Sequence, residues 1–353
     1  MEQYETTYNL SSLEGRFTDF DQWVQRLEEN FEIRSSQRNT ATEKKHEEPI
    51  DNTFIFKLQE LHVEVASWGQ ATNPPILLVH GYMDSVATFI PLIGELPDNY
   101  YYVGFDIPGH GKSDAFPPGI ISHQHIVEVI RRVVLYMEWE SFTLMAHSMA
   151  CVIGMFYNHL YPGKITKCIY IDPRSSLIAY YYVHHKQLLW YNFVYLNYYD
   201  NYERFNADTP KLYTIDEAIS SVTKKRGLSK EQAEIILSRS LVPVENDKYM
   251  LSWDPRSKKI SAMSVSEETF YTIITKHSVP TLVIEATNSS DLFDAEEFIN
   301  DVMEECKNTL PDYQIVTVEG AHDVHITNPE VTAEHVAKFL RTKFGRGNFL
   351  SKL

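Results

Sequence analysis

The strongest constraint on the fold is an alternation of short apolar segments with longer amphipathic ones. This strand–helix order predicts a mostly parallel central sheet with helices on both of its faces. Ligands of such sheets bind at the carboxyl ends of the strands, so a functional site is expected there. The strands are predicted at residues 76–80, 101–106, 142–146 and 168–171, and the helices at residues 121–137 and 150–161.

The alternation stops at Pro173 and resumes near residue 264. The intervening residues 173–263 are rich in aromatic side chains, have a helical rhythm and show no clear strands, which predicts a helical lid. The lid would interrupt a core formed by residues 51–172 and 264–342. Further core elements are predicted as a hairpin at residues 53–68, strands at 281–284 and 314–318, and helices at 292–306 and 328–339.

The two ends of the chain differ in character from the core. Residues 1–50 form a polar extension with one amphipathic stretch at 20–31, which predicts a surface helix followed by a linker. No secretory signal and no apolar run long enough for a membrane span is present. Residues 343–353 read as a flexible tail that ends in Ser351, Lys352 and Leu353, a peroxisomal import address. A peroxisomal import receptor is therefore an expected partner.

Charge and cysteine usage restrict the classes of ligand. The net charge of −16 disfavours nucleic acid and anionic membranes as partners. Cys151, Cys168 and Cys306 lie far apart in apolar or helical stretches, which indicates free, buried thiols. The chain contains no Cys/His cluster, phosphate-binding loop or dinucleotide fingerprint, so neither a metal nor an organic cofactor is expected.

Four motifs follow the predicted strands in order. Residues 146–150, Ala-His-Ser-Met-Ala, have Ser148 between a strand and a helix, as in a nucleophile elbow with alanines in place of the usual glycines. The others are His-Gly-Tyr-Met-Asp at 80–84, Asp-Ile-Pro-Gly-His-Gly-Lys-Ser at 106–113, and Gly-Ala-His-Asp-Val-His at 320–325. Together they resemble the α/β-hydrolase superfamily, and in particular the serine hydrolase-like proteins of animals, over residues 55–342.

The resemblance implies a serine hydrolase mechanism. Ser148 would be the nucleophile and His322 its base, with the backbone N–H groups of Tyr82 and Met149 as the oxyanion hole. Epoxide hydrolases and haloalkane dehalogenases of similar fold carry Asp at the nucleophile position, so Ser148 argues against both. The other motif histidines, at positions 80, 110, 147 and 325, are interpreted as groups that hold loops or pack.

The acid of the triad is left open between three carboxylates. The superfamily usually takes the acid from the loop after the strand that ends near Ala286, which favours Asp291 and then Asp294. Asp172, at the end of the strand before the lid, is the third candidate. Its alternative interpretation is a strand-end carboxylate that caps a turn.

The lid suggests the substrate. Its aromatic side chains, among them Tyr181, Trp190 and Tyr195, favour either an apolar pocket or packing of the lid on the core. A neutral carboxylic ester of an apolar acyl or aromatic group is the leading substrate class, with a thioester second. An anionic thioester would need a basic patch, for which the candidates are Lys186, Arg204 and residues 224–226; that cluster is interpreted as an ordinary solvated helix end.

Three functions compete at this point. The leading one is a carboxylic ester hydrolase that works through an acyl-enzyme on Ser148. A non-catalytic ligand-binding protein on the same fold is the second, motivated by the alanines that flank Ser148 and by the open choice of acid. An acyltransferase that uses an acceptor other than water is the third.

The terminal tripeptide makes a prediction about location. A fluorescent protein that carries residues 343–353 at its carboxyl end should accumulate in peroxisomes, because the import receptor reads a free terminal Ser-Lys-Leu. Co-localisation with a peroxisomal marker in cells measures this. The same fusion without Ser351, Lys352 and Leu353 should spread through the cytosol; equal distribution of the two fusions would contradict the address.

Overall fold

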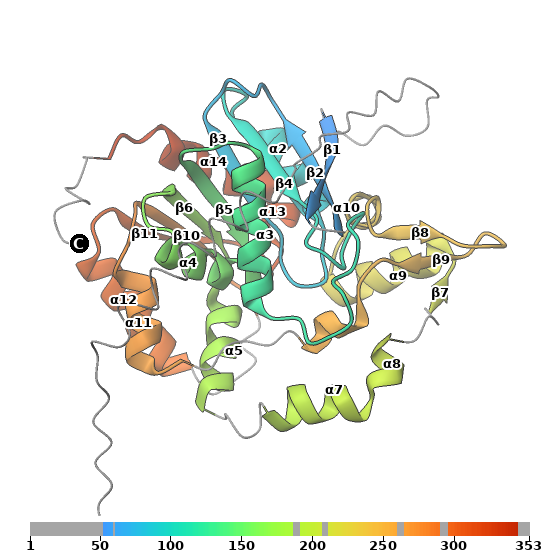
Figure 1. The fold of residues 1–353 in the computed structure, drawn as a ribbon. Coiled ribbons are helices and arrows are strands. Elements are labelled where there is room, and N and C mark those ends of the chain that lie inside the picture. Colours follow the sequence, from blue (N-terminus) through green and yellow to red (C-terminus); the bar gives the residue numbers. More distant parts are fainter. Residues whose placement is uncertain are drawn as a thin grey trace, which may run out of the picture.

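The computed structural model contains one large sheet with helices on both sides (Figure 1). Its eight strands run in the order β1-β2-β4-β3-β5-β6-β10-β11. The pairs β1–β2 and β2–β4 are antiparallel, and all the other pairs are parallel. The strands are β1 (Asn52–Leu58), β2 (Leu61–Trp68), β3 (Pro75–Val79), β4 (Tyr101–Phe105), β5 (Phe142–His147), β6 (Ile165–Ile171), β10 (Thr281–Ala286) and β11 (Tyr313–Val318). The structure describes residues 52–58, 61–185, 191–206, 211–259, 265–289 and 296–344.

The central strands are apolar along their whole length because both faces of the sheet are covered. In β3, Leu77 and Val79 point to one face, and Ile76 and Leu78 to the other. The first face packs against α3 (His123–Tyr136), α4 (Met149–Leu160), α11 (Glu267–Thr275) and α12 (Glu296–Thr309). The second packs against η2 (Val86–Phe89), α2 (Ile90–Glu95), α13 (Val324–Thr327) and α14 (Pro329–Arg341). The predicted parallel sheet and its helical layers are therefore confirmed.

Between β6 and β10 the chain builds a cap that lies beside one end of the sheet (Figure 1). The predicted absence of strands in this segment is wrong, because three short strands pair there in the order β7-β9-β8. Strands of two or three residues are too short to show an alternating pattern in the sequence. The cap contains α5 (Arg174–His185), the π-helix η3 (Tyr191–Leu196), α7 (Asn197–Asp200), α8 (Tyr202–Asn206), β7 (Leu212–Tyr213), α9 (Ile215–Arg226), α10 (Lys230–Leu237), β8 (Leu241–Pro243), β9 (Tyr249–Leu251) and η4 (Pro255–Lys259).

Arginine side chains fasten the cap to the loops at the strand ends. Arg239, which follows α10, donates two hydrogen bonds to Asp106 at the end of β4, and both side chains are fully buried. The remaining lone pairs of Asp106 accept the backbone N–H groups of Val86 and Lys112. A buried charge pair is stabilising where its other hydrogen bonds are also satisfied, as they are for this carboxylate.

Two more arginines make comparable contacts. Arg256 pairs with Asp254 and donates to the backbone carbonyls of Phe116 and Pro117 in the core. Arg226, the last residue of α9, pairs with Asp84 and Asp323, which belong to two different core loops. The cap is thus held by directional contacts with the same loops that carry the sequence motifs.

Several predictions fall on residues outside the described ranges. Among these are the helix at residues 20–31 and the targeting residues Ser351, Lys352 and Leu353. The three cysteines are free and buried, as predicted. Within the described part of the chain, no helix is long and apolar enough to cross a bilayer.

The buried pair between Arg239 and Asp106 makes a prediction about stability. Arg239→Met should lower the free energy of unfolding by about 3–5 kcal/mol, because Asp106 would be left as an uncompensated buried charge. Urea denaturation measures the difference. The control is Lys230→Met on α10, whose partner Glu234 is exposed; it should stay within about 0.5 kcal/mol of wild type. Equal effects of the two substitutions would contradict the role given to the buried pair.

Candidate active site

Ser148 lies at a sharp turn between the last residue of β5 and the first residue of α4. Its backbone angles are φ 54° and ψ −123°, a region that residues with a side chain rarely adopt. The Ser148 N–H donates to the carbonyl of Ile171 at 2.9 Å, which ties the turn to the neighbouring strand β6. The elbow predicted from the sequence is therefore formed, although Ala146 and Ala150 replace the usual glycines.

The loop after β3 passes very close to this elbow. A Cβ atom on Gly81 would come within 2.9 Å of His147 Nδ1 and 3.1 Å of Ser148 Cβ. Only glycine leaves room for that approach. The next residue, Tyr82, lines the same cavity as Ser148. Gly81 thus brings the Tyr82 backbone to the side of Ser148 that the sequence motif predicts.

His322 is in contact with Ser148. Its Nε2 lies 2.8 Å from Ser148 Oγ, a hydrogen-bond distance suited to transfer of the hydroxyl proton. The loop after β11 carries this histidine, so the contact joins residues that are 174 positions apart in the chain. Ser176 Oγ, at the start of α5, also lies 3.3 Å from Ser148 Oγ. The sequence analysis did not single out Ser176, and no motif in the sequence marks it.

Asp172 is the carboxylate that contacts His322. Its Oδ2 lies 2.5 Å from His322 Nδ1 and accepts a hydrogen bond from Ser289 Oγ at 2.5 Å, while Oδ1 accepts the Ala286 N–H at 3.1 Å. Burial raises the pKa of Asp172, but the hydrogen bonds from His322, Ser289 and Ala286 together outweigh burial and leave the pKa below its ordinary value. The group is therefore an ionised carboxylate at neutral pH.

The geometry supports Asp172, and not the preferred Asp291, as the acid that contacts His322. Asp291 and Asp294 lie outside the described residues, whereas Asp172 occupies the position beside His322 Nδ1. The physical reason is that β6 and β10 are adjacent parallel strands, so their carboxyl ends meet at one edge of the sheet. An acid at the end of either strand can reach the same histidine. Ser289, at the position where the superfamily usually has its acid, instead donates to Asp172.

The two predicted oxyanion donors belong to the helix that follows Ser148 and to the loop that packs against the elbow. Met149 is the first residue of α4, and the first N–H groups of a helix have no partner inside the helix. Tyr82 follows Gly81 in the loop that packs against the elbow. Both N–H groups therefore come from segments next to Ser148, and their role in binding an oxyanion stays a prediction.

His80 and His325 contact neighbouring loops, in agreement with their interpretation from the sequence, whereas the ring nitrogens of the buried His110 have no hydrogen-bond partner among the described residues. His80 Nε2 accepts the Ile107 N–H at 2.9 Å, so its proton is on Nδ1, which donates to the Gly81 carbonyl at 2.8 Å. Burial lowers the pKa of His80, which keeps this tautomer neutral. His325 is buried and its Nε2 contacts Thr88 Oγ1 at 2.5 Å.

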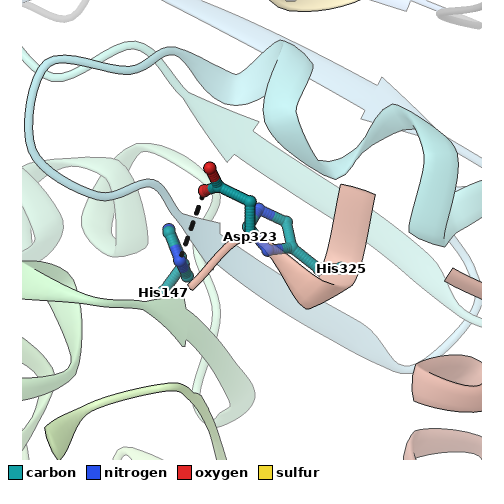
Figure 2. A group of neighbouring side chains, drawn as sticks. All are labelled: His147, Asp323 and His325. Atoms are coloured by element: carbon teal, nitrogen blue, oxygen red, sulfur yellow. Dashed lines mark ion pairs between the residues drawn. The ribbon is translucent and has the colours of Figure 1, made fainter. Parts of the chain in front are cut away.

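His147, Asp323 and His325 form a buried group beside the candidate triad (Figure 2). Among the described residues, it is the one set of ligand-type side chains close enough to hold a metal ion, with one ligand atom from each residue inside 4.8 Å. However, both oxygens of Asp323 accept hydrogen bonds from Arg226, at 2.8 and 2.6 Å. The guanidinium thus already supplies a cation at this carboxylate.

Protonation in this group is set by burial and by Arg226. Burial lowers the pKa of His147 to about 4, so its ring is neutral at physiological pH. Burial raises the pKa of Asp323, but the hydrogen bonds and the charge of Arg226 outweigh burial and leave the pKa well below its ordinary value. His147 Nε2 also lies 3.2 Å from the His322 carbonyl, so the group supports the loop that carries His322.

Ser148 and His322 open into a cavity of about 1060 Å³ between the core and the cap. The predicted substrate residues do not line it: Tyr181 donates to Glu267 and stacks on Phe298, and Tyr195 stacks on Tyr199. Trp190 lies outside the described residues. The rings that do line the cavity come from the core and from other cap elements, and are Tyr82, Phe116, Phe205, Tyr213 and Trp253.

Tyr181 instead contacts core helices, and Tyr195 is exposed beside Tyr199. Tyr181 lies on α5, which packs against α12 and α4 rather than over the cavity. Aromatic density in a sequence indicates buried or stacked rings, but it does not indicate which face of a short helix they occupy.

The chain matches known proteins over most of its length. A family model described as alpha/beta hydrolase fold matches residues 74–329. A human protein named serine hydrolase-like protein 2 is 28% identical over 292 residues, which cover 79% of this chain and 91% of that protein.

Solved structures give the same fold. A hypothetical protein from Pseudomonas aeruginosa has a TM-score of 0.67 at 19% identity, and the match covers 82% of this chain and 99% of that one. The thioesterase domain from the curacin biosynthetic pathway has a TM-score of 0.63 at 18% identity, with coverages of 81% and 98%. With the elbow, the strand order and the family match in agreement, this chain belongs to the α/β hydrolase fold family.

Proposed function

We propose that this hydrolase is a serine hydrolase that cleaves carboxylic esters or thioesters through an acyl-enzyme on Ser148. The observation that carries the proposal is the continuous chain of contacts from Ser148 Oγ to His322 and from His322 to Asp172, at 2.8 and 2.5 Å. Such a chain links a nucleophile, a base and a group that orients the base. It opens into a cavity large enough for an extended acyl or alcohol group.

In the first half of the reaction, Ser148 Oγ attacks the carbonyl carbon of the substrate while His322 Nε2 takes the hydroxyl proton. The carbonyl π electrons move to oxygen, and the backbone N–H groups of Met149 and Tyr82 stabilise that oxyanion. The intermediate collapses with cleavage of the bond to the alcohol or thiol, which leaves with the proton from His322.

In the second half, His322 takes a proton from water as the water attacks the acyl carbon. The second intermediate collapses, the bond to Ser148 Oγ breaks, and the proton returns to that oxygen as the acid is released. Throughout, the ionised carboxylate of Asp172 accepts a hydrogen bond from the N–H at His322 Nδ1, which selects the tautomer with a free Nε2 and stabilises the imidazolium.

Ser148→Ala should abolish both hydrolysis and covalent labelling. Wild type is expected to label with a fluorophosphonate and to hydrolyse an acyl-ester series, and Ser148→Ala should lose at least about 10⁴-fold in kcat because the nucleophile is gone. His322→Ala should lose labelling as well, since the proton acceptor is removed. A folded wild-type protein that neither labels nor turns over any ester, but retains a ligand, would contradict the proposal and favour a binding protein.

Asp172→Asn identifies the acid. Loss of the carboxylate should reduce kcat by about 10³–10⁴-fold, because the amide favours the wrong tautomer of His322. The matched controls Asp291→Asn and Asp294→Asn should stay within about twofold of wild type, since Asp172 already fills the position beside His322 Nδ1. Steady-state hydrolysis of one ester by all three variants measures this. A large loss in Asp291→Asn with an active Asp172→Asn would reverse the assignment.

A further inference from the structure

The charges that line the active-site cavity do not match the charge of the whole protein. The chain carries a net charge of −16. Among the residues that the structure describes, the cavity lining nevertheless contains five Lys or Arg side chains and three carboxylates, an excess of two positive charges. The cationic side chains are Arg204, Lys211, Lys225, Arg226 and Arg256, and all five belong to the cap.

The three carboxylates of the lining already have partners. Asp84 and Asp323 pair with Arg226, and Asp254 pairs with Arg256. These pairs are largely buried and fasten the cap. Of the described carboxylates in the lining, none is therefore left to neutralise the other three cations.

Arg204 and Lys225 differ from Arg226 and Arg256 in their ion pairs. Within the described part of the chain, neither has a carboxylate in ion-pair contact. Arg204 lies on α8 and Lys225 in the last turn of α9, so two separate elements direct cationic side chains to one cavity. Lys211, on the third side, lies 4.7 Å from the centre of the Tyr213 ring.

Helix electrostatics explain only part of this arrangement. Basic residues in the last turn of a helix are favoured by the helix dipole, which accounts for Lys225 as a residue of α9. Arg204 is likewise in the last turn of α8, but the dipole does not explain why two different helices direct their cations to the same cavity. Convergent cations in a partly enclosed site attract an anionic ligand, and the negative remainder of the surface repels it from other places.

Lys225 is connected to His322 through the residue that follows it in the chain. It precedes Arg226, whose guanidinium contacts Asp323, the residue after His322. The rest of the lining includes Phe116, Phe205 and Trp253, which offer apolar surface. The cavity therefore combines Ser148, apolar walls and cationic side chains from the cap.

We propose that the substrate of Ser148 carries an anionic group, a carboxylate or a phosphate, which binds Arg204 and Lys225 while the scissile carbonyl lies at Ser148. The inference rests on the proposed serine hydrolase function and specifies its substrate class. It replaces the neutral ester expected from the sequence with an amphiphilic ester or thioester whose apolar part lies between two polar ends.

The test compares matched substrates that differ in charge. One pair is an acyl ester with a methyl terminus and the same ester with a terminal carboxylate; the other is a thioester of a phosphate-bearing thiol and of its dephosphorylated form. Wild type should have a kcat/KM at least about tenfold higher for the anionic member of one pair, from the combined effect of two charged contacts. The pair that shows the preference distinguishes carboxylate from phosphate.

The variant Arg204→Gln/Lys225→Met should lose that preference through a raised KM for the anionic substrate. Added salt should weaken the preference in wild type, because exposed cations are screened. Lys230→Met removes a cation of the cap that does not line the cavity, and should leave the preference unchanged.

Failure of this inference is distinct from failure of the proposed function. Turnover of neutral and anionic esters with equal kcat/KM, or a preference that survives in the double variant, would overturn the anion site and leave the serine hydrolase intact. Absence of all turnover would count against the hydrolase. In that case, calorimetric binding of the carboxylate-terminated ester and of the phosphate-bearing thioester to Ser148→Ala still decides the anion site: binding of one of them should weaken about tenfold with Arg204→Gln/Lys225→Met added, and unchanged binding of both would overturn it.

Discussion

The guanidinium of Arg226 connects the three parts of the molecule that must be in register for chemistry at Ser148. Arg226 belongs to the cap and binds two carboxylates of the core. Asp84 lies in the loop that carries Tyr82, and Asp323 lies in another loop, next to His322. Burial of these carboxylates would be unfavourable without the guanidinium, so the two loops and the cap stabilise one another. The positions of the base and of one predicted oxyanion donor therefore depend on a contact made by the cap.

The second constraint is backbone strain at the strand ends. Ser148 and Asp172 both have positive φ, at 54° and 46°, and each follows a buried parallel strand. Such conformations cost about 1–3 kcal/mol each and persist only where the surroundings enforce them. Here the N–H groups of both residues are bound to neighbouring strands, to the carbonyls of Ile171 and Ile284. The sheet thus holds Ser148 and Asp172 at one edge, where His322 from a third strand end meets both.

The fold and two members of the site could be predicted from the sequence because their signals are local. An apolar run followed by a small-residue turn and a helix marks Ser148. The motif at residues 320–325, directly after the last strand, marks His322. The carboxylate could not be chosen from the sequence, since Asp172 and Asp291 follow strands whose adjacency is a property of the folded sheet. The short cap strands and the contacts of Tyr181 could not be predicted for the same reason, because they depend on segments far apart in the chain.

The central claim is that Ser148 carries the acyl group during turnover, and rapid mixing with a chromogenic ester tests it most directly. We expect a burst of released alcohol equal to one equivalent of enzyme when deacylation is the slower step. Mass spectrometry of the quenched sample should find the acyl group on the peptide that contains Ser148. Turnover with no acylated peptide from this segment, or an acyl group on another residue, would contradict the account.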